Sequence, residues 1–390
     1  MGDLALRLAM LPPRLPLEVW DRAIDHLWND RAALEACSLT CHAWFSCTRV
    51  HVFRNAQVHL HCEQDCDTLA NLTAPYTAHP LRLLSIVNLG RTASFHAEAD
   101  AATQARWLDD KLPPLLPELF RAETLHLFNV IWATGIPRGL EGNPWYDWLR
   151  LYLAMPPKAR ASVRTLSPRI RTLVLQAVWF EGRRMFQEFL DDFTGMVKLD
   201  LQDITITESE STMRRAPSVL DFTKLKRLSV VQLRVASILR KEGALGVLSS
   251  KFSPEVRELR IMFCDLAQGS LGDDLTAVQI QWQLWDEAIA TLHRLNPHVL
   301  IRLMLECVEF GSVGESREDL ATSMAKYDTC LEGLTQELGA YLRQSVDSGA
   351  RVVITCTPPK EMPFKAFWLT ADGPQPCLEG PIEDVAERVY

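Results

Sequence analysis

Residues 170–180 read IRTLVLQAVWF, and residues 196–206 read MVKLDLQDITI. In both stretches, apolar residues recur at steps of three, two, three and two, with mostly polar or small residues between them. The two central apolar residues, such as Leu173 and Leu175, are two positions apart, so they point to the same side of an extended strand. The pattern therefore predicts a short strand that buries one face and then turns into another element.

The same spacing recurs along most of the chain. In a sequence that is 47% hydrophobic, five matching positions occur by chance at about 2% of starting points, so the context of the copies matters more than their number. The central pairs are nearly all Leu, Ile or Val, and helical stretches such as residues 183–193 and 276–295 follow several copies. The copies are Leu81-Leu84-Ile86-Leu89, Ala122-Leu125-Leu127-Val130-Trp132, Ile170-Leu173-Leu175-Val178-Phe180, Met196-Leu199-Leu201-Ile204-Ile206, Leu225-Leu228-Val230-Leu233-Val235, Val256-Leu259-Ile261-Cys264-Leu266 and Leu300-Leu303-Leu305-Val308-Phe310.

Strands that alternate with helices predict an α/β fold in which each repeat stacks on the next. Only the middle copies approach the spacing of roughly 20 to 29 residues that is usual for leucine-rich repeats. We therefore predict an irregular leucine-rich-repeat-like strand/helix solenoid. Residues 319–346 have heptad-like spacing, and they either dimerise or, as we favour, form an outer helix over the last strands. The predicted organisation is a tail (1–14), a helical unit (15–55), a linker (56–80), the repeat region (81–357) and a Pro-rich C-terminal tail (358–390).

The helical unit is predicted to contain three short helices. Apolar residues between Val19 and Leu27 share one helical face, and Pro16 suits a helix start because its missing N–H would have no partner there. Asp30 is placed to cap the second helix, and a third segment contains Trp44. A unit of this size buries too little surface to be stable alone. It therefore predicts packing against a partner or against the rest of the chain.

The stretch that begins at Leu15, LPLEVWDRAIDHLWNDRAALEACSLTCHAWF, resembles an F-box, in the form abundant in basidiomycete fungi. The matching features are the Leu-Pro opening, an acidic residue, a helix-spaced Ile and Leu, and Cys-Ser-Leu with Cys and Trp downstream. Thr40 and His42 depart from the residues usual in that family, Val and a basic residue. The resemblance covers about a tenth of the chain. It implies docking on a Skp-family adaptor and, through it, on a cullin-RING ubiquitin ligase.

By matched position, the resemblance also implies an adaptor-binding surface. The repeat region would then hold a target protein within reach of the ligase, as a substrate receptor. The alternative is a non-ligase interaction scaffold whose F-box-like helices only cap the repeats. The residues that would form or support the adaptor-binding surface are Leu15, Pro16, Val19, Ile24, Leu27, Leu34, Leu39, Cys41 and Trp44.

Target recognition is expected on the strands. If one face of the sheet packs on helices, the residues between the apolar positions point to the other face. Their mixture of polar, charged and a few apolar groups suits protein recognition, and it equally suits an ordinary solvated sheet face, so both readings remain open. The candidate target-binding residues are Thr124, His126, Phe128, Thr172, Gln176, Lys198, Asp200, Arg227, Glu258 and Arg260.

Composition argues against several other functions. The formal charge is -8, so we expect neither a nucleic-acid nor a membrane partner. Without a secretory signal or a long apolar stretch, we expect a cytoplasmic and/or nuclear protein with reduced cysteines. We find no catalytic or cofactor-binding motif, and we predict that the chain is not an enzyme and needs no cofactor. His59, His61, Cys62 and Cys66 lack the two separated pairs typical of zinc sites, so we predict no metal there.

Overall fold

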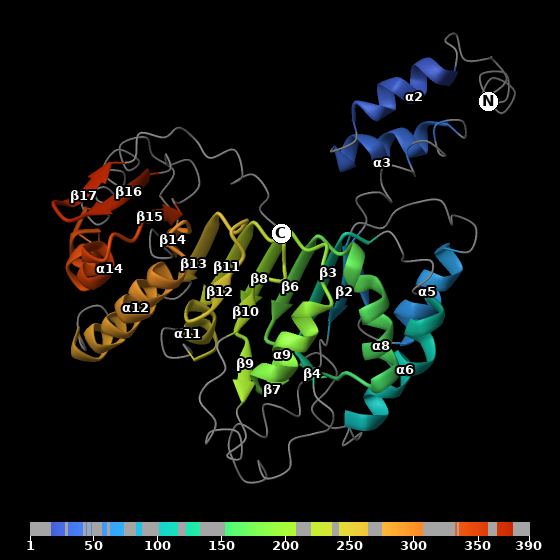
Figure 1. The fold of residues 1–390 in the computed structure, drawn as a ribbon. Helices are drawn as coiled ribbons and strands as arrows, with labels where there is room; N and C mark the ends of the chain where they lie inside the picture. The colour runs from blue at the N-terminus through green and yellow to red at the C-terminus, as the bar shows by residue number, and fades with distance from the viewer. Residues whose placement is uncertain are drawn as a thin grey trace, which may run out of the picture.

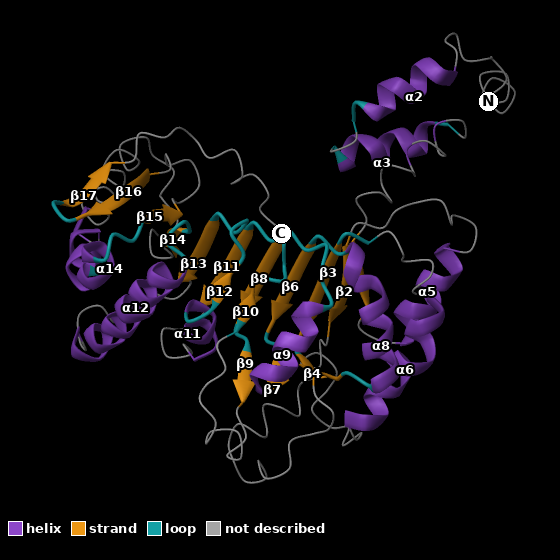
Figure 2. Ribbon diagram, in the orientation of Figure 1, coloured by secondary structure: helices purple, strands orange, loops and turns teal. Residues whose placement is uncertain are grey.

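The chain is a mixed α/β protein built on one large, mostly parallel sheet (Figure 1), with helices packed beside it (Figure 2). No helix in the described part of the chain has the length and apolar character needed to cross a membrane. The structure is a computed structural model, and it describes residues 17–27, 30–41, 44, 48, 57–60, 63–73, 83–87, 101–115, 122–132, 153–207, 220–235, 242–263, 275–306, 332–333, 335–357 and 365–376.

The large sheet has eleven strands among the described residues, and their order in space follows their order in the chain. Every pair from β1 to β15 is parallel, and the last two strands are added antiparallel. The strands are β1 (Gln57–Leu60), β2 (Leu83–Val87), β3 (Thr124–Phe128), β6 (Thr172–Gln176), β8 (Lys198–Gln202), β11 (Val230–Val235), β13 (Glu258–Phe263), β14 (Leu300–Glu306), β15 (Val352–Thr357), β16 (Lys365–Thr370) and β17 (Gly373–Pro376).

The apolar pairs of successive strands lie in register. This alignment stacks like side chains along the whole sheet, and burying one face in this way fixes the register, because a slip by one residue would expose the apolar set. From β3 to β14 these residues are at most 3% exposed. One row joins Val58, Leu84, Leu125, Leu173, Leu199, Val231, Leu259, Ile301 and Val352, and the next joins Leu60, Ile86, Leu127, Leu175, Leu201, Leu233, Ile261, Leu303 and Ile354.

One backbone hydrogen-bonding arrangement recurs just before the strands. Arg171 O accepts from the N–H groups of Val197 and Lys198, at 2.7 and 3.0 Å. Val197 O accepts in the same way from Ser229 and Val230, at 2.8 and 3.3 Å. This hydrogen-bonding arrangement repeats although the intervening sequences differ in length. The carbonyl group just before one strand therefore finds its donors at the start of the next strand.

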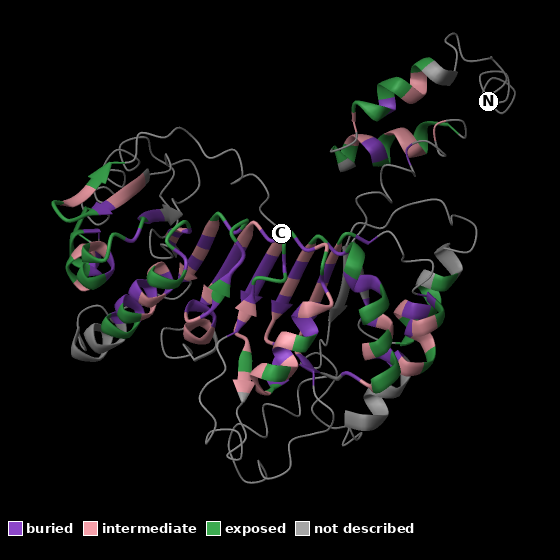
Figure 3. Ribbon diagram, in the orientation of Figure 1, coloured by how far each residue is buried: buried purple, intermediate pink, exposed green. Residues whose placement is uncertain are grey.

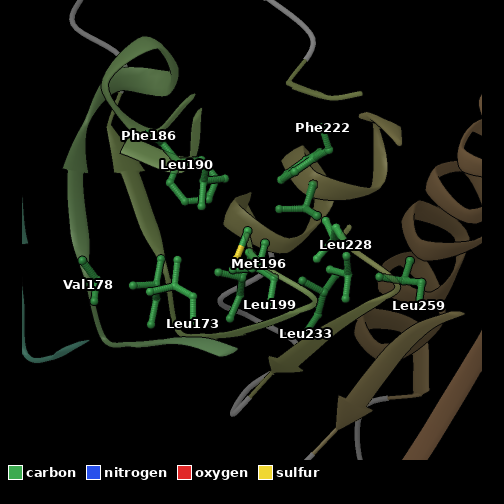
Figure 4. Packing of buried hydrophobic residues seen from close by; sticks show 14 of the residues in the cluster. Leu173, Val178, Phe186, Leu190, Met196, Leu199, Phe222, Leu228, Leu233 and Leu259 are labelled. Atoms are coloured by element: carbon green, nitrogen blue, oxygen red, sulfur yellow. The ribbon is translucent and has the colours of Figure 1, made fainter. Parts of the chain in front are cut away.

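Helices cover the apolar face of the sheet. In Figure 1, α8, α9, α11 and α12 lie on the near side of the strands. Figure 4 shows how Phe186 and Leu190 of α9 face Leu173 and Leu199 of the strands, and all four side chains are fully buried. The helices beside the sheet include α5 (Glu63–Thr73), α6 (Ala101–Leu115), α8 (Pro157–Leu166), α9 (Gly182–Asp191), α11 (Glu242–Leu248), α12 (Leu275–Leu295) and α14 (Arg343–Asp347), with a 3-10 turn at Ser167–Arg169.

A second small sheet follows the first. Asn129, Ala177 and Asp203 end β3, β6 and β8 with positive φ values of 54°, 51° and 51°. This left-handed conformation turns the chain sharply. The short strands beyond the turns pair in the order β5-β4-β7-β9, and a separate pair joins β10 to β12. Their bounds are β4 (Val130–Trp132), β5 (Leu153–Ala154), β7 (Trp179–Glu181), β9 (Thr205–Thr207), β10 (Asp221–Phe222) and β12 (Lys251–Phe252).

Two of the predicted copies have the wrong frame. In the copy that starts at Leu225, the buried strand pair is Val231 and Leu233 rather than Leu228 and Val230. Leu225 and Leu228 are buried in the turns before β11. These additional apolar residues allowed the repeat spacing to be placed in two frames. The copy that starts at Leu300 is shifted by two residues, since Ile301 and Leu303 are the pair in register with β13. A shift by two keeps the side chains on their predicted faces, whereas a shift by three reverses them.

The predicted linker and tail contain structure that belongs to the sheet. Residues 56–80 include β1 and α5, and β1 pairs with β2. The Pro-rich tail includes β16 and β17. The repeat spacing did not mark them, because β1 has only four residues and the apolar run 366–369 of β16 lies within the Pro-rich segment.

The predicted outer helix can be compared with the structure over its second half. Leu338 and Leu342 are 1% and 0% exposed, and they lie in the same apolar core as Ile354 and Leu369 of the last strands. This packing agrees with an outer helix rather than a dimerising one for residues 335–347. Residues 319–331 lie outside the described residues.

The last strand of the sheet, β17, carries two prolines. Thr370 and Gly373 flank a two-residue hairpin loop and form its closing pair. Positions opposite each other in an antiparallel ladder alternate between bonded and non-bonded pairs. Pro374 and Pro376 therefore occupy non-bonded pairs, and their nitrogens face the outer edge of the sheet. Neither nitrogen has a hydrogen to donate there.

Candidate functional site

The first candidate surface lies on the N-terminal helices α2 (Leu17–Asp25) and α3 (Arg31–Thr40). Between them, Asp30 N donates to Leu27 O at 2.8 Å. The Asp30 carboxylate then accepts from Ala33 N at 2.9 Å and caps α3, which confirms the predicted cap. The tight turn and the cap fix where the two helices end and begin.

A few side chains form the interior of this helical unit. Ile24 and Leu34 are only 2% and 1% exposed, so they can support an adaptor-binding surface but cannot form it. The rings of Trp20 and Trp44 lie 4.6 Å apart between centroids, at an interplanar angle of 46°. Such an aromatic contact joins the third segment to α2.

Other apolar side chains of the same unit remain exposed. Leu39 is 88% exposed and Val19 is 46% exposed. Cys41 is exposed as well, and Leu27 and Trp44 are half-buried. In Figure 1, α2 and α3 lie apart from the large sheet. Large apolar side chains that stay exposed on a small helical unit are candidates for contact with another protein. The two remaining predicted adaptor-binding residues, Leu15 and Pro16, lie outside the described residues.

The second candidate surface is the face of the large sheet that turns away from the helices, which we call the polar face. Its side chains are mostly half-buried, and the strands in Figure 3 therefore alternate between buried and intermediate residues. The structure brings together on this face all the predicted target-binding residues except Arg227, namely Thr124, His126, Phe128, Thr172, Gln176, Lys198, Asp200, Glu258 and Arg260.

Arg227 does not lie on the polar face. It is exposed in the turn before β11, because the predicted frame of that copy was three residues too early. Sequence reasoning therefore missed the side chains that β11 does contribute, because the frame is decided by the pairing of Val231 with Leu199 of β8. The residues of β11 on the polar face are Val230, Gln232 and Arg234, opposite Lys198, Asp200 and Gln202 of β8.

A compact charged cluster occupies the polar face where β13 meets β14. Arg260 and Arg302 are directly opposite each other, and both bond to the carboxylate of Glu258, at 2.9 and 2.5 Å. The three side chains are only 15%, 12% and 14% exposed. Burial alone would raise the pKa of Glu258, but the hydrogen bonds from the two guanidinium groups outweigh it and hold this pKa below its usual value.

A second charged pair lies on β8 and β11. Arg234 Nη2 donates to Asp200 Oδ2 at 3.0 Å. The Asp200 side chain is 4% exposed, whereas Arg234 is 34% exposed. Burial raises the pKa of the Asp200 carboxyl, although Arg234 and Lys198 act against it. Asp200 Oδ1 and Arg234 Nε are both buried, and neither has a hydrogen-bond partner.

Within the described ranges, no group of three or more His, Cys, Asp or Glu side chains is arranged to hold a metal ion. Of the four His and Cys residues at which we predicted no metal, Cys66 lies in the apolar core, and His61 and Cys62 fall outside these ranges.

Compared with the models of known protein families and with curated proteins, the chain matches none of them. Its class is therefore defined by the structure: a mixed α/β protein with a large, mostly parallel sheet and a short helical unit before it. The chemistry of its two candidate surfaces is that of noncovalent binding, because one offers exposed apolar groups and the other offers fixed charges and hydrogen-bonding groups.

Proposed function

We propose that this chain is an F-box-type substrate receptor of a cullin-RING ubiquitin ligase. The single observation that carries the proposal is the 88% exposure of Leu39 on α3, inside the stretch that resembles an F-box. A leucine so exposed on a small helical unit gains free energy when a partner covers it, at about 25 cal/mol for each Å² of apolar surface. In the resembling family that partner is a Skp-family adaptor.

We further propose that the sheet region is an irregular leucine-rich-repeat-like solenoid. Three features support this reading: the strands follow chain order, their apolar pairs stay in register, and the same backbone bonds recur at the four steps from β3 to β13. In a solenoid each repeat contacts mainly its neighbours, so loops of different length fit between repeats without disturbing the stack. This explains why unequal spacings in the sequence are compatible with one continuous sheet.

The two surfaces together suggest a mechanism that involves no chemical step by this chain. The helical unit would bind the adaptor, and the polar face would hold a target protein. Linking the two raises the effective concentration of the target's lysines near the ubiquitin-transfer machinery. The rate gain would therefore depend on geometry between the two surfaces rather than on a catalytic residue.

A second candidate is an interaction scaffold that does not act in ubiquitin transfer. It would use the same polar face, and its helical unit would pack on the repeats instead of on an adaptor. The placement of α2 and α3 away from the sheet in Figure 1 favours the receptor over this scaffold. Adaptor binding separates the two candidates.

The adaptor-binding prediction is tested with Leu39→Asp in the full chain. We expect this variant to bind a purified Skp-family adaptor about 30-fold more weakly than the wild type, because a charge at a central apolar contact costs about 2 kcal/mol. Affinity is measured by titration calorimetry. Since Leu39 is exposed in the free chain, the variant should unfold at the wild-type urea concentration.

Glu35→Ala on the same helix is the matched control, because Glu35 is also exposed. It should bind the adaptor within about twofold of the wild type, as expected for a residue outside the contact. Failure of the wild-type chain to bind any Skp-family adaptor would exclude the receptor function and leave the scaffold.

A further inference from the structure

The pair formed by Asp200 and Arg234 leaves hydrogen-bonding capacity unused at the centre of the polar face. A guanidinium and a carboxylate can form two parallel hydrogen bonds, but here only one joins them, from Arg234 Nη2 to Asp200 Oδ2. The other carboxylate oxygen, Oδ1, and the other edge nitrogen, Nε, have no partner. One of these buried atoms accepts a hydrogen bond and the other donates one.

This arrangement is unfavourable for the free chain. Leaving a buried donor or acceptor unsatisfied lowers stability, and the effect is larger for charged groups. The raised pKa of Asp200 reflects the same loss of solvation. A side chain of the same size without charge would avoid both penalties. On the neighbouring strand the fold does satisfy a carboxylate, since Glu258 bonds to one arginine through each of its two oxygens.

The two unused atoms define the chemistry of a complementary group. A carboxylate or phosphate would accept from Arg234 Nε but would be repelled by Asp200, and an ammonium group would donate to Asp200 but could accept nothing. A group that both donates an N–H and accepts at a carbonyl oxygen satisfies both atoms, and an amide is such a group. Both atoms are closed to solvent in the free chain. Arg234 is one-third exposed, so it is the side chain that has to move aside for such a group to reach them.

We propose that Asp200 and Arg234 form a subsite for an amide group of a bound polypeptide, either an Asn or Gln side chain or a backbone amide. The inference rests on the proposed function, because it names the chemistry by which the polar face would read a target. The flanking side chains fit a polypeptide ligand: Gln232 and Val174 lie opposite Asp200 on the two neighbouring strands and offer one polar and one apolar contact. Lys198 adds a positive charge on the same strand.

The first test measures stability and needs no ligand. In the variant Asp200→Val/Arg234→Leu, both unsatisfied atoms are replaced by apolar groups. If the pair is kept for binding, the folding equilibrium constant should increase by about tenfold, as found when buried ion pairs are replaced by apolar residues. The measurement is the urea midpoint of the full chain. A lower midpoint would show that the pair stabilises the fold, and it would overturn the proposal.

The matched control is Arg184→Leu/Glu188→Val on α9. This pair is also joined by one hydrogen bond, but it is exposed and has no unsatisfied buried atom. Its replacement should leave the urea midpoint unchanged. An equal rise in both double variants would attribute the gain to added hydrophobicity and contradict the proposal.

The second test measures binding to an array of random peptides of about 15 residues, a length sufficient for extended recognition. Arg234→Lys keeps the positive charge but removes the Nε donor. For peptides that bind the wild-type chain, it should raise the dissociation constant by about tenfold, the value of one charge-assisted hydrogen bond. Lys224→Arg on the helical side of the sheet, whose ammonium bonds Asp191 at 2.7 Å, should leave binding unchanged.

The outcomes distinguish failure of the amide subsite from failure of target recognition by the polar face. Peptides that bind the wild type and Arg234→Lys equally would overturn the amide subsite and leave target recognition intact. A wild-type chain that binds no peptide would contradict both the subsite and recognition of linear target segments by the polar face. Adaptor binding through α2 and α3 would be unaffected in either case, because it is measured separately.

Discussion

Replacing Glu258 with alanine is expected to lower the free energy of unfolding by about 4 kcal/mol, the largest effect of any substitution considered for this chain. Glu258 bonds to both Arg260 and Arg302. Its removal leaves two guanidinium groups, each at least 85% buried by side-chain area, facing each other across adjacent strands. Like charges placed directly opposite in a sheet repel, and removing one member of a buried ion cluster is far more damaging than replacing the whole cluster. Urea unfolding of the purified chain measures the effect.

The effect of Glu258 should also depend on pH. Its pKa in the folded chain lies below the ordinary value of 4.5, so its stabilising contribution is fully present above that value. The contribution is lost as the pH falls through the lowered pKa, because the carboxyl then takes up a proton. We therefore expect Glu258→Gln to be clearly less stable than the wild type at pH 7, and the difference to shrink in acid.

The control for Glu258 is Glu255→Ala, since Glu255 is exposed in the turn before β13. This variant should unfold within about 0.5 kcal/mol of the wild type. If Glu258→Ala were equally mild, or if its effect were the same at every pH, the ion cluster would not contribute to stability as we infer.

The second large effect is expected at Asp286, where alanine should lower the free energy of unfolding by about 3 kcal/mol. Asp286 lies on α12 and is 6% exposed. Its carboxylate accepts from Gln344 N at 2.9 Å and from Ser345 N at 2.7 Å, and the Ser345 hydroxyl also bonds to it. The residue before α14, Leu342, provides no side-chain cap of its own. Asp286 therefore caps α14 from another helix, and its loss leaves the N–H groups of Gln344 and the buried Ser345 without this acceptor.

Two variants test this role of Asp286. Asp286→Asn keeps one acceptor oxygen and should have an intermediate effect, whereas Glu287→Ala alters an exposed neighbour and should have almost none. Urea midpoints give the order of stability. Hydrogen exchange at the amides of Gln344 and Ser345 gives the location, because these amides should lose protection in Asp286→Ala before the sheet does. Unchanged exchange at these two amides would rule out the capping role.

Much of the sheet was predictable because its signal is local. Leu173 with Leu175, and Leu199 with Leu201, each form an apolar pair in a short strand, and the strands are where the pattern placed them. The prediction failed near Leu228, because the apolar residues there fit the repeat spacing in two different frames. Only the pairing with β8 decides between these frames, and that is a contact between residues about 30 positions apart, which no local pattern contains.

The candidate surfaces show the same division between local and distant causes. Asp30 could be recognised as a cap from its place before an apolar run, and the structure confirms it. The partners of Asp200 and Glu258 could not, because Arg234 and Arg302 meet them only through strand register. The exposure of Leu39 follows from the small size of the helical unit, which cannot bury all its apolar residues.

The two prolines of β17 have a consequence for how copies of this chain behave in a crowded cell. A sheet that adds strand after strand in one direction resembles a growing fibre, and an open last strand would invite the first strand of another copy to continue it. Within β17 as described, residues 373–376, Pro374 and Pro376 deprive that outer edge of N–H donors, so an incoming strand finds carbonyl groups there without matching donors. Growth at this end is therefore terminated chemically, and the protein can expose its other surfaces to partners without polymerising through its C-terminal edge.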